Sequence, residues 1–415
     1  MMKAEITAGS PALPVAAWPA VLTVYGAALL QGMTLVSFPA VSAVLKQALG
    51  LTDAGYGALF LPQVALAIAG ALAGGGLARR LGLKALLAMA LAANGASQVL
   101  LAASAYASPS GGFALLFAGT ASLGLGFGLI GGPINALPAL LFPRRADTAI
   151  VAAHTVIGLG LAVGPLIAGP FAAAGAWSAF PALLAGACVA GALSALLVML
   201  PEPALAAAGN EQASKLPFAS PAFWLFAAIT VTYAFAEGTF SNWAVIFLRD
   251  VKGLPGMAAS FALSAFWGML VAGRLLVSVL ILRIPLRFIW IALPVLMIAA
   301  FWLVSLANGA AAGIGAFALA GLACSAFLPL TISLAAARFP ANVAWVSSML
   351  IAALMTGVGV GSWMTGALQA RLPLDTLYRL SSLYPLLVLA LAWLGSKSLS
   401  KHKGVQAATS QTGCT

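Results

Sequence analysis

Runs of about 20 apolar residues follow one another along almost the whole sequence, and they constrain the fold more than any other feature. A helix of roughly this length crosses the ~30 Å hydrocarbon core of a bilayer. Lipid-exposed backbone must satisfy its own hydrogen bonds, and the strands of a barrel would show alternating apolar and polar residues instead. The 415 residues are 63% hydrophobic and only 7% charged. We therefore predict an all-α integral membrane protein.

The apolar runs predict twelve membrane-spanning helices. Their expected bounds are 16–45, 55–78, 83–106, 112–141, 149–174, 178–200, 222–249, 257–282, 288–308, 311–338, 344–370 and 378–398. The longest polar interruption, from Pro201 to Ser220, separates the sixth span from the seventh. We therefore expect an N-terminal segment over 1–15, a six-helix bundle over 16–200, a linker over 201–221, a second six-helix bundle over 222–398 and a tail over 399–415.

The basic residues predict the orientation of the chain. With both ends in the cytoplasm, 13 of the 19 Lys and Arg residues fall in cytoplasmic segments, five fall in outer loops and Arg274 lies within a span. This excess follows the positive-inside rule. We expect a multi-pass protein of the cell (inner) membrane with both termini cytoplasmic. The net charge of +11 then reflects topology in a lipid bilayer, and no nucleic-acid partner is expected.

An internal repeat supports two equivalent halves. Five residues recur 197 positions later: Phe142, Pro143, Gly160, Gly164 and Gly169 recur as Phe339, Pro340, Gly357, Gly361 and Gly366. Two halves of the same topology, related by an axis along the membrane normal, are typical of transporters, which bind substrate between the halves near mid-membrane.

The fifth predicted span contains closely spaced small residues. Gly160, Gly164 and Pro165 follow Gly158 at intervals that let helices approach closely, and a proline bends a helix. Two interpretations stay open for these residues and for Gly357 and Gly361: close packing alone or a bend that takes part in gating.

Two of these features resemble the major facilitator superfamily. The fifth helix of that superfamily often carries a GxxxGP motif, as Gly160 to Pro165 does here. Residues 76–84, Gly-Leu-Ala-Arg-Arg-Leu-Gly-Leu-Lys, look like its signature loop between the second and third helices. Arg79 stands where the family usually has an acidic residue, and Leu83 where it has a basic one. The resemblance implies a twelve-helix transporter, with Arg79 and Arg80 as gating or packing residues at the cytoplasmic surface.

A narrower resemblance points to the fucose and glucose proton-symporter (fucose permease-like) branch. It is carried by the segment Asn135–Pro165, by Glu237 followed by Asn242 and Trp243, and by the segment Phe266–Leu275. The branch implies proton-driven uptake of a neutral polar solute, often a sugar, with carboxylates in the first and fourth helices. This chain has no carboxylate in those two helices.

Glu237 is the acidic residue that we place well inside an apolar span. A charge near the bilayer centre costs roughly 2.5–3.5 kcal/mol on insertion scales, so such residues commonly mark a pathway. Tyr233, Glu237 and Phe240 recur at helical spacing and share one face. We predict that Glu237 serves proton coupling or substrate binding, with Arg274 of the next span as its counter-charge. The alternative is a structural pair between Glu237 and Arg274.

Other polar and aromatic residues within the spans are candidates for the substrate cavity. The set comprises Tyr25, Gln31, Asn135, Tyr233, Asn242 and Trp267. His154 is expected to make a structural hydrogen bond or, less simply, to relay protons. Trp243 and Trp363 lie near span ends, where tryptophan commonly anchors a helix at the membrane interface.

The sequence therefore predicts a secondary active transporter.

 It would move a small, mostly neutral organic solute by alternating access, with proton-coupled uptake as the expected mode and a single chain as the expected unit. A proton-driven exporter of drugs or metabolites is the first alternative, and a transport-derived receptor is the second. An enzyme is not expected, because the sequence has only two histidines and no cluster of cysteines or carboxylates. No metal and no cofactor is implied.

Overall fold

The computed structural model describes residues 18–202 and 217–394, and all regular structure in these ranges is helical. Within these two ranges, eleven stretches are long and apolar enough to cross a membrane. One of them, Asp53–Tyr106, has 54 residues, which is enough for two crossings. The predicted all-α fold with twelve spans is confirmed. The predicted segments 1–15 and 399–415 lie outside the described residues, as does most of the predicted linker 201–221.

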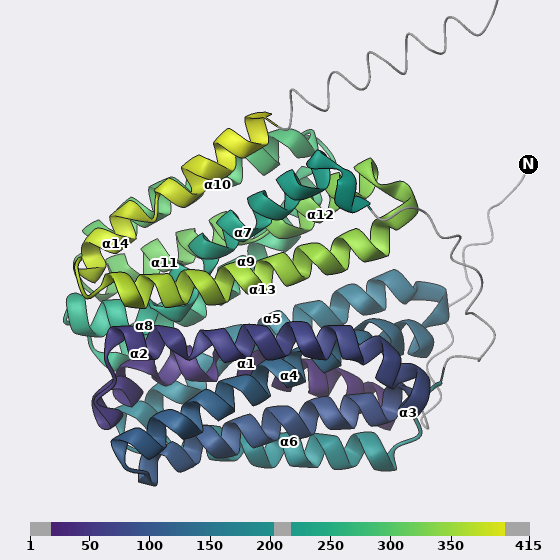
Figure 1. Cartoon of the computed structure of the whole chain (residues 1–415), viewed down its shortest axis with the longest axis horizontal. Coiled ribbons are helices and arrows are strands. Elements are labelled where there is room, and N and C mark those ends of the chain that lie inside the picture. Colours follow the sequence, from purple (N-terminus) through teal and green to yellow (C-terminus); the bar gives the residue numbers. More distant parts are fainter. Residues whose placement is uncertain (1–17, 203–216, 395–415) are drawn as a thin grey trace, which may run out of the picture.

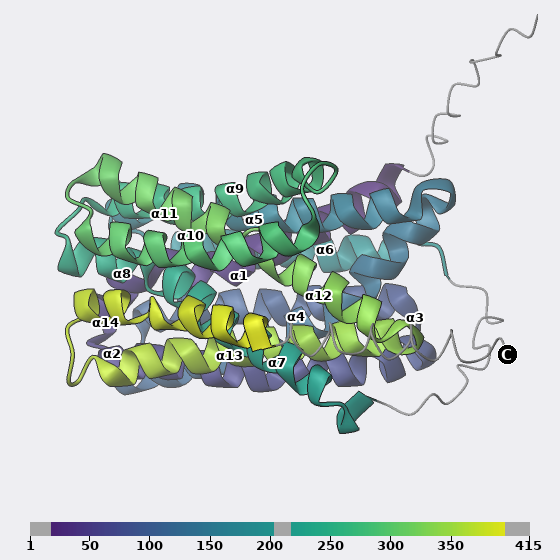
Figure 2. The same ribbon diagram turned by 90° about the horizontal axis from the view of Figure 1, so that it is seen from above.

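The helices form two groups that follow each other in the sequence (Figure 1). The first group comprises α1 (Trp18–Leu49), α2 (Asp53–Ala58), α3 (Phe60–Ala103), α4 (Pro109–Leu141), α5 (Ala146–Ala173) and α6 (Ala179–Leu197). The second comprises α7 (Pro221–Asn242), α8 (Ala244–Ile246), α9 (Gly256–Leu280), α10 (Leu286–Leu306), α11 (Ala310–Cys324), α12 (Phe327–Arg338), α13 (Val343–Leu368) and α14 (Leu374–Leu380), which continues as a spanning stretch to Leu394. The long helices run along a common direction (Figure 2).

Within each group, the fifth helix of the predicted repeat packs on the first. A Cβ atom at Gly160 of α5 would lie 2.2 Å from the Leu29 carbonyl oxygen of α1. A Cβ atom at Gly357 of α13 would lie 2.5 Å from the Val231 carbonyl oxygen of α7. The two glycines therefore occupy equivalent close contacts between helices. Pro165 lies inside α5, which is helical on both sides of it.

One end of the bundle is marked by a sharp turn within α3. Gly82 has φ 83° and ψ 162°, a backbone conformation that glycine adopts far more readily than other residues. It separates the second span from the third. Glu202, the last described residue before the linker, places its Oε1 atom 3.4 Å from the position of a Gly82 Cβ. We call this end the linker end. Arg79 and Arg80 are exposed here and line an open hollow of about 430 Å³.

The opposite end, which we call the far end, holds the ion pairs found among the described residues. Lys46 lies 2.5 Å from Asp53 and 3.7 Å from Asp250, so it joins α1 of the first group to the segment after α8 in the second. Asp375 pairs with Lys252 at 3.1 Å and with Arg379 at 2.7 Å.

The two groups contact each other closely from the far end to the middle of the bundle. A Cβ atom at Gly57 of α2 would lie 2.9 Å from the Ser362 carbonyl oxygen of α13. On the opposite flank, a Cβ atom at Gly169 of α5 would lie 2.9 Å from the Ser260 Oγ of α9. The Tyr56 hydroxyl donates to the Asn242 carbonyl oxygen at 3.0 Å. These contacts close the space between the groups at the far end.

Trp243 lies at this closed interface and not at a membrane surface. Its side chain is fully buried, and its ring meets that of Tyr56 edge to face at 5.2 Å. The expectation that Trp243 anchors its helix at the membrane interface is wrong, because α7 ends at Asn242 and α8 turns the ring inward against the first group.

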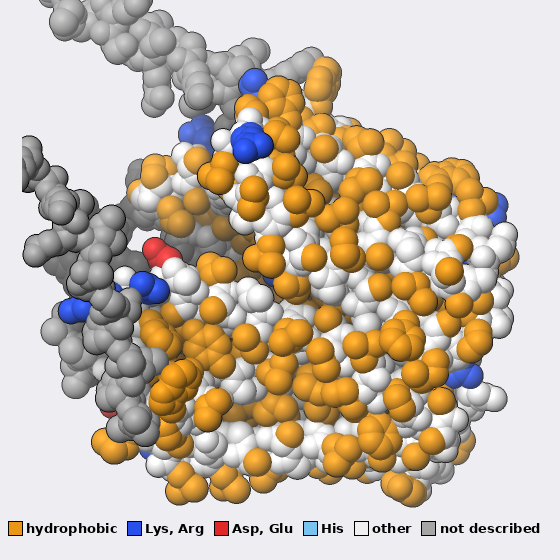
Figure 3. Space-filling view, turned by 180° about the vertical axis from the view of Figure 1, so that it is seen from behind, with side chains coloured by type: hydrophobic (Ala, Val, Ile, Leu, Met, Phe, Trp, Pro, Cys, Tyr) orange, Lys and Arg blue, Asp and Glu red, His pale blue; other side chains and the backbone are white. Residues whose placement is uncertain are grey.

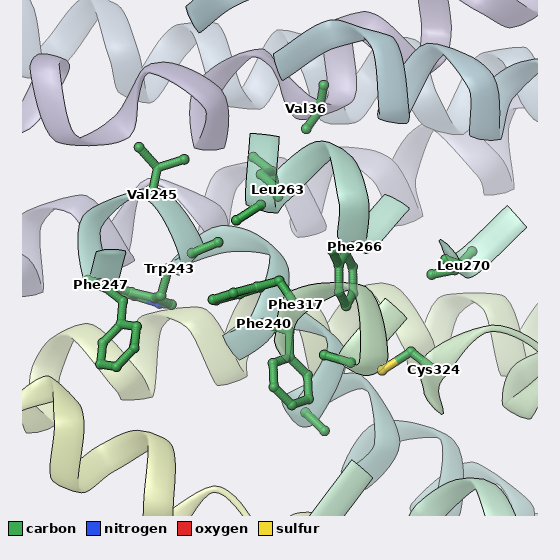
Figure 4. Close-up of a cluster of buried hydrophobic side chains, with 14 of the residues drawn as sticks. Val36, Phe240, Trp243, Val245, Phe247, Leu263, Phe266, Leu270, Phe317 and Cys324 are labelled. Atoms are coloured by element: carbon green, nitrogen blue, oxygen red, sulfur yellow. The ribbon is translucent and has the colours of Figure 1, made fainter. Parts of the chain in front are cut away.

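The side-chain surface agrees with a membrane environment. Hydrophobic side chains cover the broad face seen in Figure 3, and the Lys and Arg side chains visible there gather toward its edges. Inside the second group, Phe240, Phe266 and Phe317 form part of a buried cluster, with Cys324 beside it (Figure 4). Aromatic packing therefore helps to hold the helices of this group together.

Gly321 offers a test of helix packing within the second group. A Cβ atom there would lie 1.9 Å from the Phe266 carbonyl oxygen, whereas a Cβ atom at Gly315 of the same helix would meet nothing within 4 Å. Overpacking costs typically about 1–3 kcal/mol. We expect Gly321→Ala to lower the midpoint of thermal unfolding in detergent and Gly315→Ala to leave it unchanged or higher. Equal midpoints for the two variants would contradict this packing.

Candidate functional site

The tenth predicted span is broken in the middle. The span was expected to be continuous over 311–338, but α11 ends at Cys324 and α12 begins at Phe327. Ala326 between them has φ −109° and ψ 0°, which is outside the helical range. A helix end leaves backbone carbonyl groups without partners inside the helix, and in a membrane they need other donors.

Two side chains from neighbouring helices supply those donors. The Tyr233 hydroxyl, on α7, lies 2.9 Å from the Cys324 carbonyl oxygen. The Arg274 Nε–H, on α9, donates to the Ser325 carbonyl oxygen at 2.9 Å. The Tyr233 ring also packs on the ring of Phe327, with centroids 4.9 Å apart. The break is therefore enclosed by two residues that the sequence assigned to the candidate site.

Glu237 lies one turn of α7 beyond Tyr233 and accepts a hydrogen bond from its hydroxyl. Its side chain is half-buried. Arg274 is near enough to interact electrostatically with the carboxylate. No nitrogen of Arg274 comes within 4.0 Å of a Glu237 oxygen among the ion pairs of the described chain. The guanidinium is instead fixed at Ser325, so Glu237 and Arg274 flank the break without forming a direct ion pair.

The first group presents a polar pair toward the same region. The His154 Nε2 of α5 lies 3.0 Å from the Asn135 Oδ1 of α4, and the Asn135 amide donates to the Gly131 carbonyl oxygen at 2.8 Å. His154 and Asn135 are both exposed, and His154 interacts electrostatically with Arg274. Val271, one turn before Arg274, contacts α5 at Gly158, where a Cβ atom would meet its Cγ2 at 2.4 Å. His154 and Arg274 thus face each other across the two groups.

Two of the remaining predicted cavity residues lie within the first group. The Tyr25 hydroxyl donates to the Ala149 carbonyl oxygen at 3.0 Å, which connects α1 to the start of α5. Gln31 is 1% exposed, and its Oε1 accepts a hydrogen bond from the Asn94 amide at 2.8 Å. The structure therefore places Gln31 between α1 and α3 and apart from the residues around Glu237.

The other two lie in the second group. The Asn242 amide donates to the Ser362 Oγ at 2.8 Å, so Asn242 belongs to the closed far-end interface. Trp267 is half-buried, and its ring meets that of Phe266 edge to face at 5.0 Å. Along α9, Trp267 lies between Ser260, which takes part in the far-end contacts, and Arg274.

The structure brings together Glu237, Tyr233 and Arg274 in one group and Asn135 and His154 in the other. The residues that sequence reasoning missed are Cys324 and Ser325, which contribute backbone carbonyl groups. Pro329 is the sequence signal that could have found Ser325, because a proline has no N–H group to bond the carbonyl group four residues before it. In chemical terms the arrangement offers one carboxylate, one guanidinium and one imidazole. In the described part of the chain no group of three or more His, Cys, Asp or Glu side chains could hold a metal ion.

The chain is similar to a known protein family over most of its length. Residues 23–344 match the family described as Major Facilitator Superfamily. A search of curated proteins gave no significant match.

Solved structures share the fold at low sequence identity. The nucleoside transporter NupG, as its D323A mutant, superposes with a TM-score of 0.75 and 15% identity, over 90% of this chain and 99% of that chain. A bacterial homologue of the human lysosomal transporter Spinster, inward-facing and occupied, gives a TM-score of 0.74 and 16% identity, over 94% of this chain and 98% of that chain. At these identities the likeness establishes the fold alone.

Proposed function

Because this chain belongs to the Major Facilitator Superfamily, and is therefore a membrane transporter and not an enzyme, we propose that it moves a small, mostly neutral organic solute by alternating access. We propose further that transport is coupled to protons and that uptake is the physiological direction. The fold is shared with a nucleoside transporter, and this similarity is consistent with a small, neutral polar solute.

The observation that carries the proposal is the position of Glu237 beside Tyr233 and Arg274 at a break in a membrane span. Ionisable residues within spans commonly face a polar pathway, and broken helices in transporters commonly form binding sites. One carboxylate and one guanidinium carry opposite charges. A site with this balance favours a neutral solute over an anion or a cation, because neither charge is left without compensation when the solute binds.

The closure of the far end supports a proposal for the state of the transporter. If both termini are cytoplasmic, as the basic residues indicate, the far end is the outer side of the membrane. The close contacts there, at Gly57 and Gly169, then correspond to a state closed to the outside. The two groups would be the two six-helix bundles, 16–200 and 222–398, which rock about the site in a cell (inner) membrane.

The resemblance to the fucose permease-like branch supports uptake and proton coupling within this proposal. Glu237 would replace the carboxylates that the branch carries in its first and fourth helices. The cavity would include Asn135, Tyr233 and Trp267, and the protein would work as a monomer.

Solute movement into sealed vesicles tests the proposal. Purified protein is reconstituted into liposomes, and sugars, nucleosides, organic acids and cationic drugs are each added outside with an inward proton gradient. We expect one class of neutral solute to enter faster than into protein-free liposomes. Binding of a solute without its entry would instead indicate a receptor, and movement of drugs against an opposite gradient would indicate an exporter.

A further inference from the structure

We propose that Tyr233 connects the protonation of Glu237 to the shape of the broken tenth span, so that a proton bound at Glu237 changes the angle between α11 and α12. This inference rests on the proposed function, because it assigns a role to the carboxyl group that would couple transport to protons. It makes Tyr233 a positioning residue and the segment between Cys324 and Phe327 a hinge.

The hydroxyl group of Tyr233 has one proton for two acceptors. Its hydroxyl lies within hydrogen-bonding distance of the Glu237 Oε2 and also of the Cys324 carbonyl oxygen, at 2.9 Å from the latter. A phenol donates one hydrogen bond. The two acceptors therefore compete, and only one of them receives the phenolic proton at any time.

The protonation state of Glu237 decides this competition. When Glu237 is ionised, the carboxylate is the stronger acceptor, because hydrogen bonds to charged groups are stronger. The phenolic proton then points to Glu237, and the Cys324 carbonyl group loses its donor. When Glu237 binds a proton, the carboxylic acid can donate to the phenolic oxygen. The phenolic proton then points to Cys324. The only covalent change is the O–H bond that the Glu237 carboxyl group forms with the bound proton.

The helices on the two sides of the break are held by different main contacts. On the α11 side, a Cβ atom at Gly321 would lie 1.9 Å from the Phe266 carbonyl oxygen, so α11 and α9 are in backbone contact. At the break, a Cβ atom at Gly273 of α9 would lie 2.5 Å from the Ser325 Oγ. On the other side, α12 packs on α7, α10 and α13. The break thus joins a helix packed mainly on α9 and α10 to a helix packed mainly on α13, and both helices also contact α7.

Arg274 does not compete with Tyr233 for the Cys324 carbonyl group. Its Nε–H is used by the Ser325 carbonyl oxygen, the next carbonyl group along the chain. Arg274 therefore holds one side of the break in either protonation state, and Tyr233 is the donor that responds to the proton. Loss or gain of the bond to Cys324 changes the support of the last turn of α11.

The titratable groups near Glu237 are few. Tyr233 lies on its own helix, Arg274 on α9 and Cys324 on α11, and His154 of α5 interacts with Arg274. The helix α13, which packs along α7, carries no titratable side chain. Glu237 is the acid among them that is expected to change charge between acidic and alkaline buffers, and His154 is the group to be controlled for.

The test measures the angle between α11 and α12 directly. Cys188, Cys324 and Cys414 are replaced by alanine, which keeps the Cys324 carbonyl group. Spin labels are attached at Ala312→Cys and Ala337→Cys, two exposed positions on α11 and α12. The distance between the labels is measured by pulsed electron resonance on the full-length protein in lipid nanodiscs, in an acidic and in an alkaline buffer without solute.

We expect the distance distribution to shift between the two buffers in the otherwise unchanged protein. In Glu237→Gln the amide can donate to the phenolic oxygen, so the acidic distribution is expected in both buffers. In Tyr233→Phe the donor to Cys324 is absent, so the alkaline distribution is expected in both. Tyr378→Phe removes the hydroxyl of another buried tyrosine, which bonds the Thr239 carbonyl oxygen at 3.0 Å, and should keep the shift.

Three outcomes would overturn the inference: no shift in the unchanged protein, a full shift in Tyr233→Phe, or loss of the shift in Tyr378→Phe as well as in Tyr233→Phe. A shift that persists in Glu237→Gln and disappears in His154→Gln would assign the proton to His154 and would also overturn it. These distances are measured without any solute. A protein that moves no solute but shows the expected pattern would contradict the proposed function and leave this inference standing.

Discussion

Replacing Glu237 with glutamine abolishes solute accumulation while solute exchange continues. Glutamine keeps the size of the side chain and its hydrogen bond with Tyr233, but it cannot release a proton. With one proton moved per solute, a gradient of one pH unit supports about tenfold accumulation, since about 1.4 kcal/mol corresponds to a factor of ten. We expect an accumulation ratio near one for Glu237→Gln. Labelled solute trapped in proteoliposomes, with and without a proton gradient, provides the measurement.

A second carboxylate provides the control for this prediction. Glu202 is exposed at the linker end, next to Gly82 and away from the break. Glu202→Gln removes the same charge and should accumulate solute as the unchanged protein does. Accumulation by Glu237→Gln at the level of Glu202→Gln would show that Glu237 has a structural role, and loss of exchange in Glu237→Gln would place it in solute binding.

Introducing leucine at Gly57 disfavours closure of the far end and slows transport. A Cβ atom at this position would lie 2.9 Å from the Ser362 carbonyl oxygen and 3.2 Å from Trp363 on α13. The atoms that the new side chain would meet belong to the backbone of α13, which has little freedom to move away. Overpacking of about 1–3 kcal/mol corresponds to a change of roughly 5–150-fold between two states. We expect solute uptake to fall by about the same factor.

The accessibility of a buried position reports on the same change. Val245 of α8 is 3% exposed and lies where α8 contacts α1 across the two groups. In a background without the native cysteines, Val245→Cys should react slowly with a membrane-impermeant maleimide added at the far end. Combined with Gly57→Leu it should react several-fold faster. Gly75→Leu, on the same span but with no atom within 4 Å of its Cβ position, is the matched control. Equal rates in the two combined variants would contradict the closed interface.

The number and type of helices were predictable from the sequence because the length of an apolar run is fixed by the thickness of the bilayer. The glycine repeat was also informative. Gly160 and Gly357 occupy equivalent contacts between helices, which fits the packing interpretation, and the gating interpretation stays a prediction.

The break in the tenth span has a local cause that the prediction of a continuous helix over 311–338 did not take into account. Pro329 has no N–H group, so the carbonyl group of Ser325, four residues before it, cannot form its helical hydrogen bond. The sequence does not show which groups replace that bond, since Tyr233 and Arg274 lie 91 and 51 residues before their acceptors. A tertiary contact of this kind leaves no periodic pattern.

The candidate site was predictable in part. Glu237, Tyr233 and Arg274 could be selected because polar groups inside an apolar span need a partner or a pathway. The partner of Arg274 could not be selected, because every residue carries a backbone carbonyl group that can accept a hydrogen bond from arginine, and the sequence does not show which of them lies within reach. Gln31 was selected as a side chain of the first span that can hydrogen-bond a solute, and this role stays a prediction. Which face of a helix meets a neighbouring helix depends on packing, and Gln31 bonds Asn94 of α3.

The most direct test of the account is proton movement driven by solute. Purified protein is placed in liposomes that contain a pH-sensitive dye, and each solute class is added without a pre-formed gradient to the unchanged protein, Glu237→Gln and Glu202→Gln. The account predicts that one class of neutral solute acidifies the interior for the unchanged protein and for Glu202→Gln, and that none does so for Glu237→Gln. Entry of the solute without acidification, at the same rate in all three proteins, would make this a facilitator and contradict the role of Glu237.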